Sequence, residues 1–134
     1  MKIYFDGKGA ILGRLGSVVC KELLKGNEVV IFNSEKVIIS GDKQRILEKI
    51  IWRRNLGGKG LKGPKLSKIP ERMLKRMIRG MLTWDKKRGR DAYRILKCYA
   101  GKGCLKEDEL KNARVIEMKK LLNFIELEDI CNSL

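Results

Sequence analysis

The chain of 134 residues contains no histidine, two prolines, four cysteines and few aromatic residues (6%). Without histidine, neither a Ser-His nor a Cys-His catalytic pair can form. No two cysteines form a C-x-x-C pair, and a structural zinc site needs paired ligands at short spacing. We therefore expect no metal site and no cofactor, with reduced and mostly buried thiols at Cys20, Cys98, Cys104 and Cys131.

The carboxylates do not point to a catalytic or metal site either. Asp6, Glu35 and Asp42 could approach one another at strand ends, but nothing in their spacing demands a shared metal site. We accordingly predict that the protein is not an enzyme and has no small-molecule substrate.

Long hydrophobic runs are also missing. No apolar stretch approaches the roughly 20 residues that a membrane-spanning helix requires. The chain opens on a strand-like KIYFD instead of the charged and apolar regions of a secretory signal. Because 43% of the residues are hydrophobic, a core can form. We expect one domain over residues 1–134, in the cytoplasm and without a membrane partner.

Positive charge, in contrast, is abundant and concentrated. The chain has 31 Lys and Arg against 16 Asp and Glu, a net charge of +15. Residues 52–97, hereafter the basic segment, carry 16 basic and 3 acidic residues, a net +13, whereas all other residues carry 15 and 13, a net +2. Charge gathered in this way predicts a polyanionic partner.

The centre of the basic segment has the pattern of an amphipathic helix over residues 70–82. Pro70 suits the first position of a helix. Helical geometry places the apolar side chains on one side: Met73, Leu74, Met77, Ile78 and Met81. It places the cations on the opposite side: Arg72, Lys75, Arg76 and Arg79. An ordinary solvated face mixes both signs of charge. This pattern predicts one face toward the core and one toward a single partner.

The residues on both sides of this helix are also strongly basic. Residues 55–68 contain four glycines, four lysines and no acid, which predicts a flexible basic loop. Ordering such a loop costs conformational entropy, and binding to the phosphates of a polyanion would offset that cost. After the helix, WDKKRGR at 84–90 predicts a basic turn. Four aromatic residues lie within or beside the segment and could either stack on unpaired RNA bases or pack in the core: Trp52, Trp84, Tyr93 and Tyr99. Core packing is the simpler interpretation.

The remaining elements follow from hydrophobic periodicity. A strand at 2–6, a helix at 11–25 and a buried strand at 28–33 predict a βαβ unit with parallel strands. The other expected elements are strands at 37–40 and 98–100 and helices at 42–54, 90–97, 107–122 and 127–134.

Two alternative classes of function remain open. Gly7 and Gly9 fit the first two glycines of a dinucleotide fingerprint, but Leu12 stands where the third glycine belongs. The turn and Arg14 could still hold a phosphate, although a tight turn without a ligand is the simpler interpretation. A membrane-surface helix at 70–82 is the other alternative.

Several motifs, in fixed order, carry a resemblance to a known family. They are D-G-K-G-A-I-L-G-R-L at 6–15, N-S-E-K-V-I-I-S-G at 33–41, P-E-R at 70–72, R-G-M-L at 79–82 and R-G-R-x₅-L-K-C-Y-A-G at 88–101. Over residues 3–101 the chain resembles the universal large-subunit ribosomal protein thirteen family. R-R-N-L at 53–56 resembles its archaeal branch, and the tail at 102–134 matches loosely.

This resemblance implies an α/β protein with three α/β/α layers, a four-stranded, mainly parallel sheet and basic loop and helix extensions. It also implies a structural constituent of the large subunit in cytoplasmic ribosomes, which supports subunit assembly and translation. The implied partners are large-subunit rRNA and neighbouring ribosomal proteins. Carried over by position, the motif residues are Arg14, Arg72, Arg79, Arg88, Gly89, Arg90 and Lys97.

Together, the charge pattern and the resemblance give one set of predicted RNA-binding residues. The set is Arg14, Arg53, Arg54, Lys59, Lys62, Lys65, Lys68, Arg72, Lys75, Arg76, Arg79, Lys86, Lys87, Arg88, Arg90, Arg94 and Lys97. Such a surface would recognise the shape and backbone of folded RNA instead of reading its sequence.

Overall fold

A computed structural model of the chain describes residues 1–57, 65–116 and 120–134. Its main sheet has four parallel strands in the order β4-β2-β1-β5. Their bounds are Leu96–Cys98 for β4, Glu28–Phe32 for β2, Lys2–Asp6 for β1 and Arg114–Val115 for β5. The predicted four-stranded parallel sheet is confirmed.

The predicted βαβ unit is also present. β1 leads into α1 (Leu12–Leu24) and then into β2, which pairs with β1 in parallel. Leu15, Val19 and Leu23 are fully or almost fully buried, and their spacing of four residues lines one face of α1. That face therefore packs on the sheet and anchors the first crossover.

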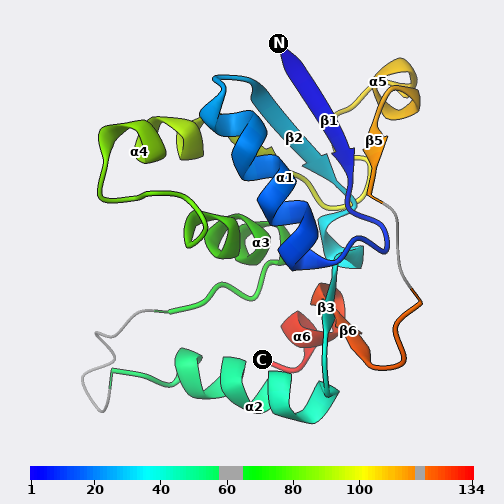
Figure 1. Cartoon of the computed structure of the whole chain (residues 1–134). Coiled ribbons are helices and arrows are strands. Elements are labelled where there is room, and N and C mark those ends of the chain that lie inside the picture. The colour runs from blue at the N-terminus through cyan, green and yellow to red at the C-terminus, as the bar shows by residue number, and fades with distance from the viewer. Residues whose placement is uncertain (58–64, 117–119) are drawn as a thin grey trace.

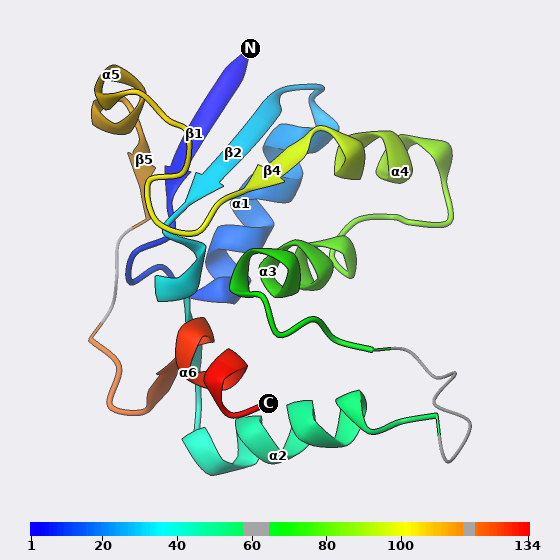
Figure 2. The same cartoon turned by 180° about the vertical axis from the view of Figure 1, so that it is seen from behind.

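The longer helices lie on one face of the sheet, and a short helix lies beside β1 at the other face (Figures 1 and 2). The apolar core on one face joins α1, α3 (Pro70–Arg79) and α4 (Lys87–Arg94) to the inward side chains of the strands, among them Ile3 and Phe5. Tyr4, between them, points to the other face. Its hydroxyl donates a 2.7 Å hydrogen bond to Glu109 of α5 (Glu107–Lys111). The arrangement is the expected three-layer α/β/α fold.

The fourth strand of the sheet comes from an unexpected place. The predicted strand at 37–40 exists as β3 (Ile38–Ser40), but it pairs antiparallel with β6 (Phe124–Glu126) in a separate ribbon. β5 instead fills the sheet edge beside β1, within the segment predicted as a helix over 107–122. The helix prediction was wrong for residues 112–116 and 120–122, and residues 117–119 lie outside the described part of the chain. A strand of two residues has no periodicity of its own, and its pairing to a distant strand decides its conformation.

Boundaries around the basic turn also differ from the prediction. The helix expected at 90–97 runs from Lys87 to Arg94, and β4 follows at once where a strand was expected at 98–100. Gly89 makes this earlier start possible, because a Cβ there would lie 2.0 Å from the carbonyl oxygen of Thr83. The helix expected over 70–82 ends at Arg79, so Met81 lies beyond it and is 43% exposed instead of buried.

α2 (Lys43–Arg54) lies at the margin of the fold, opposite α4 in Figure 1. The carboxylate of Asp42 accepts a hydrogen bond from the backbone N–H of Gln44 and caps the helix. Of its apolar face only Ile50 is buried, whereas Ile51 is 38% exposed. Within the described ranges, no helix is both long and apolar enough to cross a membrane.

The tail packs into its own domain. After a short 3₁₀ helix, η1 (Ser34–Lys36), Val37 accepts a hydrogen bond from the backbone N–H of Leu127. Leu127 opens α6 (Leu127–Asn132), and both Leu127 and Ile130 are completely buried in the core. The helix expected at 127–134 is therefore present, and it is part of the core.

All four cysteines are free thiols. Cys20 and Cys131 are buried as expected, but Cys104 is exposed. Burial raises the pKa of the half-buried Cys98 thiol to about 12, so the thiol stays protonated at neutral pH.

Leu127→Ala should lower the free energy of unfolding by about 2–5 kcal/mol, because it leaves a cavity in the core. Denaturant unfolding followed by circular dichroism measures this loss. Leu122→Ala is the matched control, since Leu122 is fully exposed and its truncation should change stability little. Equal effects of the two substitutions would contradict an integral role for α6.

An ion pair joins β4 to β2 and has a pH signature. The Lys97 ammonium lies 2.7 Å from a Glu28 carboxylate oxygen. This hydrogen bond lowers the pKa of Glu28 and raises the pKa of Lys97. Because the pKa of Glu28 is lower in the folded state, the ion pair stabilises the fold at pH values above the unfolded-state pKa of about 4.3. This stabilisation is lost as the pH falls through the folded-state pKa of Glu28.

Lys97→Met should therefore raise the pKa of Glu28 toward its ordinary value, as measured by a carbon-detected NMR titration of the carboxyl group. Lys21→Met, which removes an exposed cation elsewhere, should leave that pKa unchanged. An unchanged Glu28 pKa in Lys97→Met would show that the pair does not form in solution.

Candidate nucleic-acid interface

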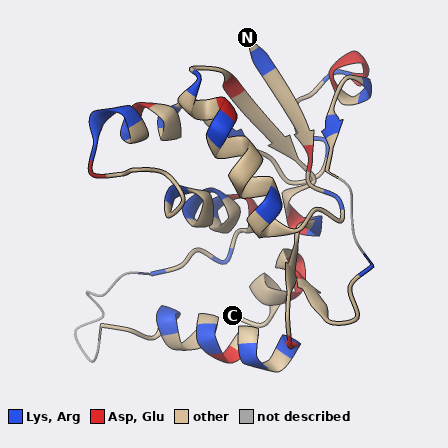
Figure 3. Ribbon diagram, viewed as in Figure 1, with Lys and Arg blue, Asp and Glu red and all other residues tan. Residues whose placement is uncertain are grey.

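The described helices of the basic segment lie along one side of the molecule, together with the rest of α2. α2, α3 and α4 follow one another along this side in Figure 1, and Figure 3 shows Lys and Arg on all three helices. α3 has the predicted opposed faces: Met73, Leu74 and Ile78 are fully buried, while Arg72 and Arg76 are exposed. Burial of the apolar face thus turns these cations outward.

Part of the predicted set is unpaired within the described chain. The following side chains make no hydrogen bond, ion pair or cation–π contact with another described residue: Arg14, Arg53, Lys65, Lys68, Arg72, Arg76, Lys86 and Lys87. Lys59 and Lys62 lie outside the described residues. Apart from Arg14, which is on α1, these cations lie on or beside α2, α3 and α4. Like charges so close together repel one another, and a polyanion would relieve that repulsion.

Other members of the set hold the chain itself. Arg54 donates to the carbonyl of Leu66 at 2.7 Å, and Arg88 donates to that of Leu24 at 3.1 Å. More weakly, Arg90 donates to the Asp85 carbonyl at 3.5 Å, Arg94 lies 3.9 Å from Asp91, and Lys97 pairs with Glu28. Except for the part-buried hydrogen bond of Arg54, these contacts are exposed and contribute little stability. The cations that make them can therefore exchange their present partners for a phosphate.

Two further cations stack on aromatic rings. The Arg79 guanidinium carbon lies 3.8 Å from the centroid of the Trp84 ring, and the Lys75 ammonium lies 4.9 Å from that of Tyr93. Trp84 and Tyr93 themselves meet edge to face, with centroids 5.2 Å apart and planes at 87°. These contacts fasten α3 to α4 and to the turn between them.

The start of α4 is unusual in its electrostatics. Lys86 is the N-cap and makes no capping hydrogen bond, Lys87 and Arg88 follow, and the first turn contains no acid. The N-terminal end of a helix carries partial positive charge, so cations there are unfavourable and anions are stabilised. These cations therefore weaken the start of the helix, and an anion bound there would stabilise it.

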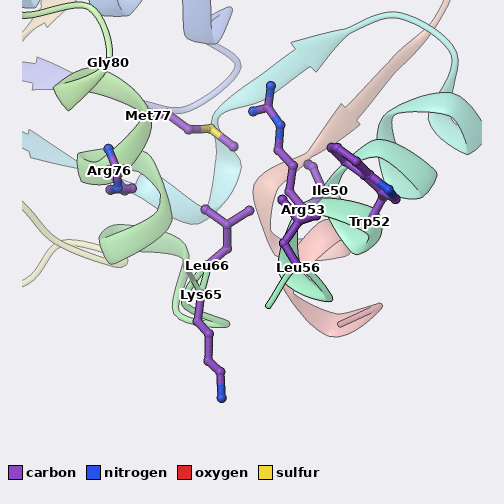
Figure 4. A pocket seen from close by; sticks show the side chains of 9 residues that line it. All are labelled: Ile50, Trp52, Arg53, Leu56, Lys65, Leu66, Arg76, Met77 and Gly80. Carbon is purple, nitrogen blue, oxygen red and sulfur yellow. The ribbon is translucent and has the colours of Figure 1, made fainter. Parts of the chain in front are cut away.

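A groove separates α2 from α3 (Figure 4). It has a volume of about 450 Å³, with apolar walls that include Leu66 and Met77. In Figure 4, Arg53 reaches from α2 toward Met77, whereas Lys65 turns away from the other labelled side chains. Arg76 completes the cationic lining, and none of the described lining residues is acidic. A groove that is apolar in its walls and cationic at its rim suits an unpaired nucleotide.

The aromatic residues divide into two kinds. Trp52 is 64% exposed beside this groove, so core packing was the wrong interpretation for it. Trp84 and Tyr93 are half-buried and engaged with each other and with two cations. Trp52 is therefore the one of these three that offers an open face to a base.

α2 carries three further cations that are not in the predicted RNA-binding set. Lys43, Arg45 and Lys49 precede the basic segment but lie on the same helix as Arg53. The basic segment begins at residue 52, inside this helix, so it excludes these three cations. The predicted helix at 42–54 already included all three of them.

The alternative phosphate site after β1 finds no support in the geometry. The backbone N–H of Gly7 donates to Phe32, that of Lys8 to the Asp6 carboxylate, and that of Gly9 to Lys36. A Cβ at Gly7 would lie 2.9 Å from the Asn33 and Phe32 carbonyl oxygens. The turn is packed against its neighbours, as the interpretation without a ligand expected.

The carboxylates considered for a metal site have structural partners. Asp6 also accepts from the Asn33 amide, and Glu35 accepts from the backbone N–H of Gly101. Among the described residues, no three His, Cys, Asp or Glu side chains are grouped so as to hold a metal ion.

Comparison with known proteins identifies the family. The sequence profile described as "Ribosomal protein L13" matches residues 1–104. The protein named "Large ribosomal subunit protein uL13" from Archaeoglobus fulgidus is 47% identical over 96 residues, which cover 72% of this chain and 61% of that relative. The protein of the same name from Methanopyrus kandleri is 43% identical over 97 residues, with shares of 72% and 60%.

The match to these two relatives thus spans about three fifths of their length. The relative of the same name from Methanosarcina barkeri matches more completely, with 42% identity over 129 residues, 93% of this chain and 91% of that protein. These relatives are archaeal, as the resemblance implied. The chain belongs to the ribosomal protein L13 family, archaeal type.

Proposed function

We propose that this protein is a structural constituent of the large ribosomal subunit that binds large-subunit rRNA through the side formed by α2, α3 and α4. The observation that carries the proposal is the outward cationic face of α3, fixed by its buried apolar face. Membership of a family whose relatives are named as large-subunit proteins supports it.

The energetics favour RNA over other polyanionic partners. Lys and Arg that neutralise phosphates release counterions, so affinity is high and depends strongly on salt. Exposed cations from three helices match a phosphate backbone that crosses them, and the open face of Trp52 adds a position for a stacked base. Supporting assembly of the subunit, and contacts to neighbouring ribosomal proteins, belong to the same proposal.

Arg14, at the start of α1, and Lys65 and Lys68, before α3, extend the proposed surface beyond the three helices. Lys97 contributes after exchange of its partner, because its ammonium is paired with Glu28 in the free protein. We propose no catalytic role, no cofactor and no membrane partner.

In native extract sedimented through a sucrose gradient at raised salt, the protein should travel with the large subunit in near-stoichiometric amount. Quantitative mass spectrometry of the fractions measures its distribution, with established large-subunit proteins as internal controls. Recovery only at the top of the gradient would show that it is not a core ribosomal component.

Arg72→Gln combined with Arg76→Gln should weaken binding to purified archaeal large-subunit rRNA and lower the salt slope by about 1.4–1.8, for two phosphate contacts at about 0.7–0.9 each. Filter binding over a range of KCl concentrations measures both quantities. Lys21→Gln combined with Lys111→Gln, two exposed helical cations outside the basic segment, is the matched control with the same charge change. Equal slopes for the two double variants would exclude α3 from the interface.

A further inference from the structure

The corner between the end of α3 and the start of α4 forms a distinct cationic hollow of about 310 Å³. Arg76, Arg79, Trp84 and Lys86 are among the residues that line it. We propose that this hollow binds one phosphate of the RNA backbone and that Trp84 is the residue that positions Arg79 for it. The inference rests on the proposed RNA binding, and it adds a defined site and a positioning residue that charge alone does not identify.

The geometry of Arg79 is suited to this role. Its guanidinium carbon lies 3.8 Å from the Trp84 ring centroid, so one face of the cation rests on the indole. The N–H donors of a guanidinium lie in its plane and point outward from its edge. Stacking therefore leaves them open, and they make no hydrogen bond to another described residue. An edge of this kind can donate two parallel hydrogen bonds to a phosphate.

Trp84 is itself held in place. Tyr93, on α4, meets the indole edge to face, and the ammonium of Lys75 lies over the Tyr93 ring. The indole is half-buried, so its orientation is set before any ligand arrives. Because Arg79 rests on this fixed ring, less side-chain freedom is lost on binding than for a solvated arginine. The aromatic pair thus acts on the cation instead of stacking on an RNA base.

The charge around the hollow favours a single anion. Arg76 lies one turn before Arg79 on α3, and Lys86 approaches from the N-cap of α4. One acid, Asp85, also lines the hollow, and its backbone carbonyl accepts from Arg90. Three cations against one carboxylate leave a net positive site. A phosphodiester, with one negative charge and two acceptor oxygens, fits this excess.

The test is a double-mutant cycle in RNA affinity with the full chain and purified archaeal large-subunit rRNA. Trp84→Leu, which keeps an apolar side chain but removes the ring face, should weaken binding by about 3- to 10-fold and lower the salt slope by about 0.7–0.9. Trp84→Phe keeps a ring face and should stay within about twofold of the unchanged protein. Adding Trp84→Leu to Arg79→Gln should cost nothing beyond Arg79→Gln alone.

A merely structural tryptophan gives a different result. Equal losses in Trp84→Leu and Trp84→Phe, or losses that add to that of Arg79→Gln, would overturn the positioning role. If Trp84→Leu does not fold, Arg79→Lys tests the site instead. This substitution keeps the positive charge but removes the planar guanidinium, so it should weaken RNA binding. Full affinity in Arg79→Lys would refute the site. Absence of salt-dependent RNA binding by the unchanged protein would instead refute the proposed function.

Discussion

Burial of one face of α3 is the interaction on which both the fold and the proposed interface depend. Met73, Leu74 and Ile78 are fully buried, and each contributes about 1.5–3 kcal/mol relative to exposure. Rotating the helix about its axis would bury a cation without a partner, which costs more than any apolar contact regained. The same contacts that close the core therefore fix the direction of Arg72 and Arg76.

This arrangement leaves electrostatic conflict in the free protein. Cations gather at the positive end of α4, and those on α3 face the same side. The chain relieves part of the conflict by stacking Arg79 and Lys75 on aromatic rings and by directing Arg54 and Arg88 to carbonyl oxygens. Local conflict of this kind, retained beside a well-packed core, is typical of a functional surface that a partner completes.

The core extends beyond the part of the chain that carries the family motifs. The family profile ends at residue 104, yet β5, β6 and α6 all follow it. α6 supplies two fully buried side chains, Leu127 and Ile130, and β5 fills a sheet edge. Backbone pairing and apolar burial accept many different side chains, so a segment outside the family profile can complete the core.

The βαβ unit, the amphipathic α3 that starts at Pro70 and the concentration of charge could all be predicted before the fold was known, because periodicity and composition are local properties. The sequence also carried the motifs of the family. Three features could not be predicted in this way: the pairing of β3 with β6 outside the main sheet, the early start of α4 that Gly89 allows against Thr83, and the stacking of Arg79 on Trp84. Each of these depends on pairing or close approach between separate elements of the fold, which no local pattern encodes.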